Sequence, residues 1–438
     1  MRKILIVCLI GVLPCLLRAQ SVKEEIFTDI NKAGGLNYVY DYKEDPSVTR
    51  APKGYRPFYI SHWGRHGARY QFSYYDSVEV WLGRASARSI LTSYGEEFLE
   101  KLTAFHKKAH YKESDLTPIG KDQHRMIASR MYRNYKYVFK GNTRVWAVAT
   151  TSPRVMLSMM SFVETLKELD GKMEASCDAS LSYYPFLNPA SKSNPAYVNR
   201  PRTTKETDRS ISAFFNEDVP WKDIYGRFFT DIDAAAELGV KPSKLIESLH
   251  FITSGMQCLD HDRGLFDGIF TPEEEYGIFR YRAMKEAAFL ANYSKSVSTF
   301  YKYSAYAIRH LIETADSDME SGEYNVRLRF CHDSNIMPLL NLLNIDGMGR
   351  EITSLEDAED IFPLYRIPMG ASIQFIFFRS RKNPEVLVKV LLNEREASLP
   401  FEPVTGPYYS WNDFKEYYGP RMESLIQSLE AENAKGKN

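Results

Sequence analysis

The sequence has 438 residues, of which 44% are hydrophobic and 26% charged, a composition close to that of an ordinary globular protein. Lys and Arg number 56 and Asp and Glu also number 56, so no basic excess indicates a nucleic acid or an anionic membrane as a partner. At roughly 100–200 residues per domain, this length predicts two lobes.

The first residues have the pattern of an export signal. Residues 2 and 3 are basic, and the apolar run over residues 4–17 is shorter than the ~20 residues needed to span a bilayer. The pattern predicts a signal peptide over residues 1–19 and an exported protein, periplasmic or extracellular. No later segment is long and apolar enough to cross a membrane. A lipid anchor on Cys15 is the alternative.

Five short stretches, mostly rich in β-branched and aromatic residues, predict buried strands. They are residues 57–61, 145–150, 326–331, 371–378 and 386–392. Between the first two, a helical pattern covers residues 93–107. A second begins at Leu116-Thr117-Pro118, where Thr117 can cap the helix and Pro118 suits its first turn. Strands that alternate with helices predict an α/β fold, with a mixed, mainly parallel sheet and helices on both faces.

The middle of the chain, residues 162–318, has no strand pattern and predicts a mainly helical inserted lobe. Its helical patterns cover residues 162–169, 231–238, 243–251 and 273–313. The α/β core is then expected over residues 20–161 and 319–438, where a last helical pattern begins at residue 423.

Three of the five cysteines lie beyond the predicted signal peptide. None has a CxxC or a Cys/His spacing typical of zinc, so no metal site is predicted. In an oxidising compartment we expect Cys177 and Cys258 to pair. Cys331 lies in an apolar strand pattern and is expected to be buried and free.

Polar clusters follow three of the predicted strands. In open α/β sheets, ligands bind outside the carboxyl ends of the strands. If these three strand ends are neighbours, they form one pocket. Its expected members are Arg65, His66 and Arg69, then Arg154, then His332 and Asp333.

Three guanidiniums in one pocket offer forked donors that match a phosphate or sulfate group. A histidine among them is kept neutral by like charge, so that a ring nitrogen is free to attack. Asp333 is the single acid of the set and can donate a proton. Each residue alone has a simpler interpretation, as a structural histidine, a solvated arginine or a helix cap, and the combination carries the prediction.

The same residues resemble the histidine acid phosphatases, the second branch of the histidine phosphatase superfamily. Residues 65–69 match the RHGxR signature of that family, and His332-Asp333 resembles its later HD element. Residues 116–123 resemble its LTxxGxxQ helix start, and Ser152-Pro153-Arg154 stands where the third pocket arginine is expected. Residues 367–372 are similar to the segment that enters a late core strand.

The resemblance implies a metal-independent phosphomonoesterase without a cofactor. It implies that His66 attacks phosphorus and forms a phosphohistidine, and that Asp333 protonates the leaving alcohol and then activates water. The phosphate would be held by Arg65, Arg69, Arg154 and His332.

The resemblance has two departures from the family pattern. Gln71 stands where the family usually has Pro, and Ser334 follows the HD element. Tyr70 resembles the multiple inositol polyphosphate phosphatases, so we expect phytate-like inositol polyphosphates as small-molecule substrates, with an acidic pH optimum. A broad-specificity acid phosphatase and a non-catalytic binder of phosphorylated compounds are the alternatives. Candidates for additional substrate contacts are Arg84, Arg88, Lys121 and Arg125.

A phosphoglycerate-mutase-like enzyme from the other branch also begins at RHG after its first strand. The export signal and the later HD element disfavour that branch. Residues 260–264 have oxygen ligands at alternate positions, as in a calcium loop, but the closing Glu is missing and we interpret them as a polar turn.

Overall fold

A computed structural model of the chain describes residues 20–71, 74–189, 203–298 and 300–435. The predicted signal peptide lies outside the described residues. Within the described part of the chain, no helix is both long enough and apolar enough to cross a membrane.

One eight-stranded sheet forms the centre of the molecule, with strand order β3-β2-β4-β1-β5-β6-β7 and β8 paired with β6. Strands β1 to β4 run parallel to one another, and β5 is antiparallel to both β1 and β6. The strands are β1 (Tyr55–Arg65), β2 (Arg144–Ala149), β3 (Glu174–Ala179), β4 (Val326–Cys331), β5 (Ser372–Ser380), β6 (Leu387–Leu392), β7 (Arg395–Glu396) and β8 (Tyr409–Ser410). All five predicted strands are confirmed, and so is the mixed, mainly parallel α/β sheet.

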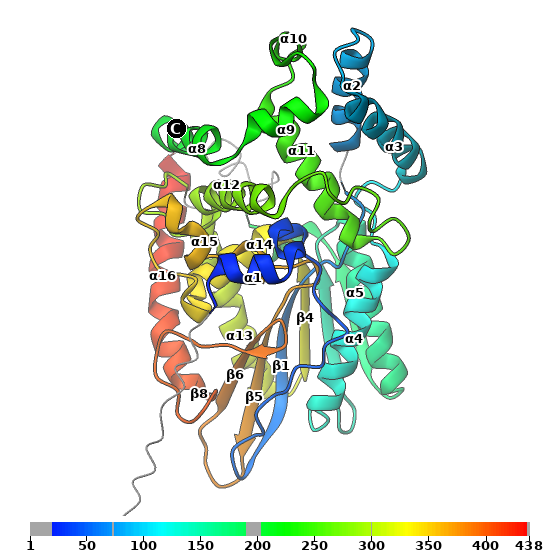
Figure 1. Ribbon diagram of the computed structural model, residues 1–438. Helices are drawn as coiled ribbons and strands as arrows, with labels where there is room; N and C mark the ends of the chain where they lie inside the picture. The colour runs from blue at the N-terminus through cyan, green and yellow to red at the C-terminus, as the bar shows by residue number, and fades with distance from the viewer. Residues whose placement is uncertain (1–19, 72–73, 190–202, 299, 436–438) are drawn as a thin grey trace, which may run out of the picture.

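Helices cover both faces of this sheet (Figure 1). Successive side chains of a strand point to opposite faces, so Ile60 of β1 packs in one apolar cluster while Tyr59 packs in another. The first cluster is built with α4 (Pro118–Asn134) and α5 (Pro153–Leu169). On the second face lie α13 (Ala305–Ser321), α14 (Asp333–Leu343) and α16 (Trp411–Lys435). The predicted second helix begins as expected, because Thr117 caps α4 and Pro118 is its first residue.

Strand β3 was missed by the sequence analysis. It lies within the range predicted to be helical, yet it pairs with β2 and forms the edge of the sheet. Its sequence, EASCDA, carries small and charged residues, and most of its side chains are exposed. An edge strand exposed in this way needs no apolar run, so its sequence has no pattern to detect.

The mainly helical lobe lies above the carboxyl ends of the parallel strands in Figure 1. It contains α8 (Lys205–Asp218), α9 (Trp221–Phe228), α10 (Ile232–Glu237), α11 (Pro242–Gly255) and α12 (Pro272–Leu290). Helices α2 (Tyr74–Ser86) and α3 (Ser93–Ala109) also pack there, against α11 and α9, although they come from the first half of the chain.

The predicted helical run over residues 273–313 is two helices. Helix α12 ends at Leu290, and α13 begins at Ala305 after the 3-10 turn η4 (Phe300–Ser304). Helix α13 contacts β1 and α16, so the chain returns to the sheet before the predicted boundary at residue 318. Helix α16 starts at Trp411, twelve residues earlier than predicted.

Short elements complete the described part of the chain. The α-helical ones are α1 (Val22–Thr28), α6 (Tyr184–Leu187) and α15 (Ala358–Ile361). The 3-10 turns are η1 (Ile30–Asn37), η2 (Leu181–Tyr183), η3 (Met256–Cys258), η5 (Ile345–Gly347), η6 (Leu355–Asp357) and η7 (Leu364–Arg366).

The expected disulfide is absent among the described residues, where all three cysteines are free. Cys177 is exposed on the edge strand β3, whereas Cys258 is buried with its Sγ 3.5 Å from Sδ of Met369. The two thiols therefore lie in different environments and do not pair. Cys331 is buried and free, as predicted.

Candidate active site

The three predicted strand ends lie side by side. Strand β4 stands between β1 and β2, and the register pairs Arg65 with Cys331 and Ala149 with Phe330. The polar segments after β1, β2 and β4 therefore leave the sheet at one edge. We call their six residues the anion pocket: Arg65, His66, Arg69, Arg154, His332 and Asp333.

The backbone at His66 is held between two strands. Its N–H donates to the carbonyl of Cys331 on β4, and its own carbonyl accepts from the N–H of Gly370 just before β5. The neighbouring Arg65 N–H donates to Ala371. The segment over residues 367–372, singled out in the sequence, thus fixes the loop from the opposite side.

Helix α4 supports the loop after His66 through a close backbone approach. A Cβ at Gly67 would lie 2.3 Å from the carbonyl oxygen of Gly120, and one at Gly120 would lie 2.2 Å from the carbonyl oxygen of Ala68. Gln123 accepts from the N–H of Ala68 at 2.8 Å and donates to the carbonyl of Met369 at 2.8 Å. The residues of the LTxxGxxQ pattern therefore hold the loop, and the first of them, Leu116, pairs in a β-bridge with Arg69 of the anion pocket.

Arg65 is fully buried and its position is fixed by three acceptors. One terminal nitrogen donates to the carbonyls of Leu36 and Ile367, each at 2.7 Å, and the other donates to Oδ2 of Asp333 at 2.6 Å. Burial lowers the pKa of Arg65, and Asp333 opposes that shift. The guanidinium is thereby pre-oriented before any ligand arrives.

Arg69 and Arg154 add two further cations. Arg69 donates to the carbonyl of Tyr70 at 2.9 Å, and burial together with Arg65 and Arg154 lowers its pKa to about 10, so it stays charged at neutral pH. Arg154 donates to Oγ of Ser114 at 2.6 Å. The N-termini of α5, which begins at Pro153, and of α14, which begins at Asp333, also face this edge, and both favour an anion.

His66 has a defined tautomer. Its Nδ1 lies 2.9 Å from the carbonyl oxygen of Gly67, which can only accept, so Nδ1 carries the proton and the lone pair is on Nε2. Burial, then the charges of Arg65, Arg154 and Arg69, hold the pKa of His66 well below its ordinary value. The imidazole is therefore neutral, with Nε2 able to act as a nucleophile.

His332 is held by two residues that follow β2. Its Nδ1 accepts from Arg154 at 3.3 Å, so Nε2 carries the proton and donates to Oγ1 of Thr150 at 3.1 Å. Burial and the charge of Arg154 lower the pKa of His332 to about 4. Its ring lies edge-on to that of His66, with 5.7 Å between centroids.

Asp333 begins α14 and accepts from Arg65 and from the N–H of Ser334, the latter at 2.7 Å. Burial raises its pKa, but Arg65, His332 and Arg69 outweigh burial, so the pKa of Asp333 lies below its ordinary value. A second carboxyl, Glu286 of α12, has its pKa raised by burial and, to a smaller extent, by the negative charge of Asp333. No motif in the sequence indicates this second carboxyl.

Gln71, a departure from the family pattern, is buried between the anion pocket and the lobe. Its Oε1 lies 3.5 Å from a terminal nitrogen of Arg69, and its side chain packs against Gly255 of α11. A proline at this position would lack the amide that faces Arg69. Gln71 could be noticed in the sequence because it stands where the family usually has Pro. Ser114 and Thr150 could not, because nothing in the sequence places them beside Arg154 and His332.

The four predicted substrate-contact residues lie outside the anion pocket. Arg84 and Arg88 are exposed, on and just after α2, which lies beside α3 in the upper right of Figure 1. Nη1 of Arg125 donates to Oδ1 of Asp122 at 3.0 Å. Lys121 is half-buried in the first turn of α4. Within the described part of the chain, these four form no hydrogen bond or ion pair with the pocket, and their role stays a prediction.

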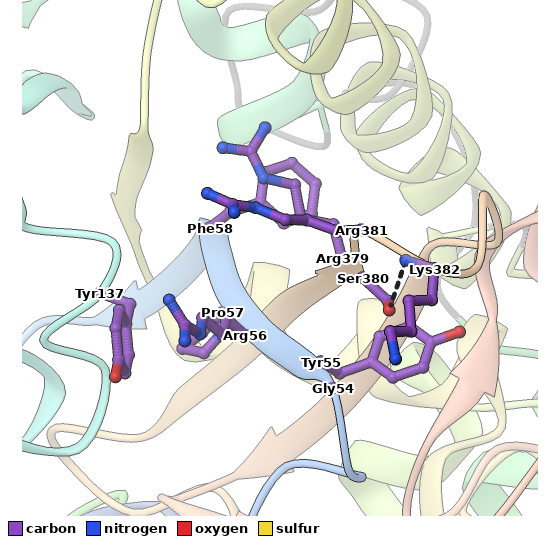
Figure 2. Close-up of a pocket in the computed structure, with 10 residues that line it drawn as sticks. All are labelled: Gly54, Tyr55, Arg56, Pro57, Phe58, Tyr137, Arg379, Ser380, Arg381 and Lys382. Atoms are coloured by element: carbon purple, nitrogen blue, oxygen red, sulfur yellow. Dashed lines mark hydrogen bonds between the residues drawn. The ribbon is translucent and has the colours of Figure 1, made fainter.

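A separate hollow of about 520 Å³ lies at the opposite end of β1 (Figure 2). Arg56 lies over the ring of Tyr137, and Arg379 lies over that of Phe58. At about 3.3 Å per residue, β1 places this hollow roughly 25–30 Å from Arg65. Its cations are exposed at the surface and do not belong to the anion pocket.

The fold is shared with solved structures of inositol polyphosphate phosphatases and phytases. The multiple inositol polyphosphate phosphatase of Bifidobacterium longum, in complex with inositol hexasulfate, aligns with a TM-score of 0.73 and 17% identity over 88% of this chain and 97% of that chain. The phytase from D. castellii aligns with a TM-score of 0.65 and 15% identity over 90% of this chain and 85% of that chain. Identities this low show a common fold. Neither a family model nor a curated protein sequence matches the chain.

Proposed function

We propose that the chain is a histidine acid phosphatase that hydrolyses phosphomonoesters through a phosphohistidine at His66. The observation that carries the proposal is the hydrogen bond from Nδ1 of His66 to the carbonyl of Gly67, which leaves the Nε2 lone pair beside three guanidiniums. A binder of phosphate compounds needs the guanidiniums but has no use for a histidine fixed in this tautomer.

The proposed reaction has two displacements at phosphorus. The lone pair of His66 Nε2 forms the N–P bond while the P–O bond to the alcohol breaks, and Asp333 gives its proton to the departing oxygen. Water then attacks phosphorus and loses a proton to Asp333, and the N–P electron pair returns to Nε2. Arg65, Arg69 and Arg154, with the N-termini of α5 and α14, stabilise the charge on the phosphoryl oxygens, so no metal is required for that task.

Asp333 must be protonated for the first displacement, although its pairing with Arg65 favours the carboxylate. A bound phosphoryl group adds negative charge beside Asp333 and competes for Arg65. Both effects raise the pKa of Asp333 in the complex. The proposal therefore includes an acidic pH optimum, at which the protonated carboxyl is populated in the presence of substrate.

Inositol polyphosphates are the proposed substrates. Tyr70 after RHGxR and the shared fold with an inositol polyphosphate phosphatase and a phytase support this choice. A broad-specificity acid phosphatase is the alternative, and it differs in releasing phosphate from simple esters as readily as from phytate-like compounds.

The test is a phosphate-release assay at acidic pH with a chelator present, using inositol hexakisphosphate and p-nitrophenyl phosphate. We expect release from both, with the higher kcat/KM for inositol hexakisphosphate. Equal efficiency would favour broad specificity. Binding of both compounds without release of phosphate would contradict the enzyme proposal and leave a binding protein.

We also propose export of the mature chain, supported by the basic and apolar pattern of the first 19 residues. N-terminal sequencing of the protein expressed in a secretion-competent host should find the mature chain starting near residue 20. A chain that retains Met1 and stays in the cytoplasm would contradict the proposal.

A further inference from the structure

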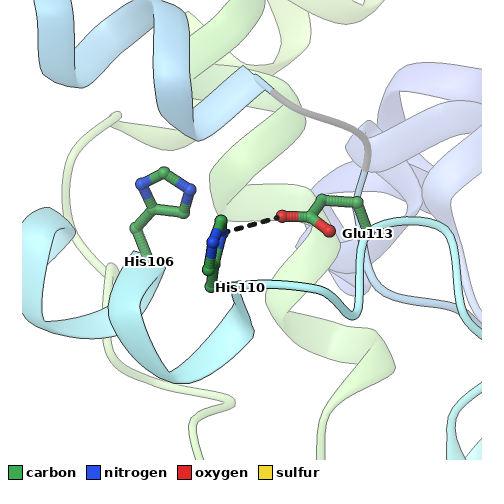
Figure 3. Close-up of side chains that lie close together, drawn as sticks. All are labelled: His106, His110 and Glu113. Carbon is green, nitrogen blue, oxygen red and sulfur yellow. Dashed lines mark ion pairs between the residues drawn. The ribbon is translucent and has the colours of Figure 1, made fainter.

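A group of histidine and carboxylate side chains lies at the end of α3, outside the anion pocket. His106 and His110 are four residues apart and so share one face of the helix end, and Glu113 follows in the loop. One ligand atom from each of the three lies within 4.8 Å of the other two. Figure 3 shows the three side chains beside one another, with the His110–Glu113 ion pair dashed.

His106 is oriented in the way that metal-binding histidines usually are. Its Nδ1 donates to Oε2 of Glu79 on α2 at 2.6 Å, and Thr103 donates to the other oxygen of Glu79 at 2.8 Å. A carboxylate on one ring nitrogen orients the ring and directs the other nitrogen towards a metal ion, which takes the place of that nitrogen's proton. That other nitrogen, Nε2, lies 2.9 Å from Oδ1 of Asp76.

We propose that His106, His110 and Glu113 bind a divalent transition-metal ion of the zinc type, with Asp76 within reach as a fourth ligand. Two imidazoles with carboxylates suit Zn²⁺ better than Ca²⁺ or Mg²⁺, which take oxygen ligands. A tetrahedral Zn²⁺ with bonds of about 2.1 Å holds its ligand atoms roughly 3.4 Å apart. Nδ1 of His110 and Oε1 of Glu113 are already 3.7 Å apart, so small side-chain movements close the site.

The ion would join α2, α3 and the loop that supports Arg154. Glu113 precedes Ser114, whose Oγ accepts from Arg154 and whose N–H donates to the carbonyl of Gln71 at 3.2 Å. Tyr111 and Ser114 both have positive φ, at 67° and 70°, which is a costly backbone conformation for residues other than glycine. A metal that holds Glu113 would stabilise this loop. The proposed phosphatase chemistry does not depend on the ion.

The experiment uses the mature chain, free of affinity tag and stripped with chelator, titrated with Zn²⁺ by calorimetry in a phosphate-free buffer. His110→Ala and Glu113→Gln change exposed or half-exposed positions, so both variants should fold, with circular dichroism as the check. We expect one Zn²⁺ per chain, bound at least about tenfold more weakly by either variant. Exposed His261→Ala is the matched control and should bind like the native chain.

The histidines of the anion pocket could also bind zinc. The variant His66→Ala distinguishes zinc binding there from zinc binding at the proposed site. The proposal expects native affinity in His66→Ala and a tetrahedral Co²⁺ absorption spectrum that His110→Ala loses. It is overturned if Zn²⁺ binds no tighter than millimolar, or if His66→Ala loses the binding while His110→Ala and Glu113→Gln keep it.

Discussion

At the residue scale, the nucleophilic role proposed for His66 depends on two neighbours of different kinds. The Gly67 carbonyl sets the tautomer, and the surrounding guanidiniums keep the ring neutral. The first effect could not be read from the sequence, because it depends on the path of the backbone after β1. The second was predicted from the arginines at the three strand ends, on the condition that these ends are neighbours, and the strand order meets that condition.

Replacing His66 by Ala removes the proposed nucleophile. We expect kcat to fall by at least about 1,000-fold and the phosphoenzyme to disappear. The measurement is single-turnover phosphate release together with trapping of the phosphoenzyme under alkaline quench, since phosphohistidine is acid-labile. His261→Ala serves as the control, and a phosphoenzyme that persists in His66→Ala would assign the nucleophile elsewhere.

Asp333→Asn tests the proposed acid against its neighbour Glu286. A general acid matters most for a poor leaving group, so Asp333→Asn should lose about 100-fold more kcat on inositol hexakisphosphate than on p-nitrophenyl phosphate. Glu286→Gln should lose similar factors on both substrates. If the two variants exchange these profiles, Glu286 is the proton donor and Asp333 only orients Arg65.

At the element scale, the anion pocket depends on the contact between the loop after β1 and the start of α4. The sequence predicted this helix start from Thr117 and Pro118, and the structure shows why its two following motif residues matter. Gly120 allows the close approach to Ala68, and Gln123 binds Ala68 and Met369 across the gap. The sequence shows Gly120 and Gln123, but their role is explained only by the residues that they contact in the fold.

Gly120→Ala tests this contact. The added methyl would meet the Ala68 carbonyl oxygen at 2.2 Å, so the loop must move; we expect a loss of about 1–3 kcal/mol of stability and at least tenfold in kcat. Gly83→Ala, in an open position of helix α2, is the matched control and should be neutral or slightly stabilising. Denaturant melts and steady-state kinetics measure both, and an active, equally stable Gly120→Ala would contradict the assigned role.

At the scale of the whole molecule, two fully buried histidines beneath the anion pocket link folding to pH. Burial lowers the pKa of His62 and of His124 to about 3. In the unfolded chain a histidine titrates near pH 6.5. Between about pH 6.5 and pH 3 the unfolded state therefore binds protons that the folded state does not, so stability rises with pH across this window and falls as the solution is acidified.

Each of these histidines should contribute about 1.4 kcal/mol per pH unit to that slope. Urea unfolding between pH 4.5 and 6 measures it, and His62→Asn should reduce the slope by about this amount, whatever its effect on absolute stability. His261→Asn, at an exposed position, is the control. An unchanged slope in His62→Asn would mean that His62 is protonated inside the fold. If the slope is as expected, acidification has two opposite effects on this protein: it favours the proposed activity and it lowers the stability of the fold.

The sequence by itself determined the α/β class, five of the eight strands, the start of α4 and six candidate site residues at three strand ends. Each of these has a local sequence pattern: an apolar run, a cap followed by Pro, or charged residues directly after a strand. The tertiary structure alone decided that β4 lies between β1 and β2, that the polar edge strand β3 belongs to the sheet, and that Cys177 and Cys258 do not pair. It also brought Gln71, Ser114, Thr150 and Glu286 to the site. These depend on contacts between distant segments, and the energy of such contacts is not encoded in the pattern of any one segment.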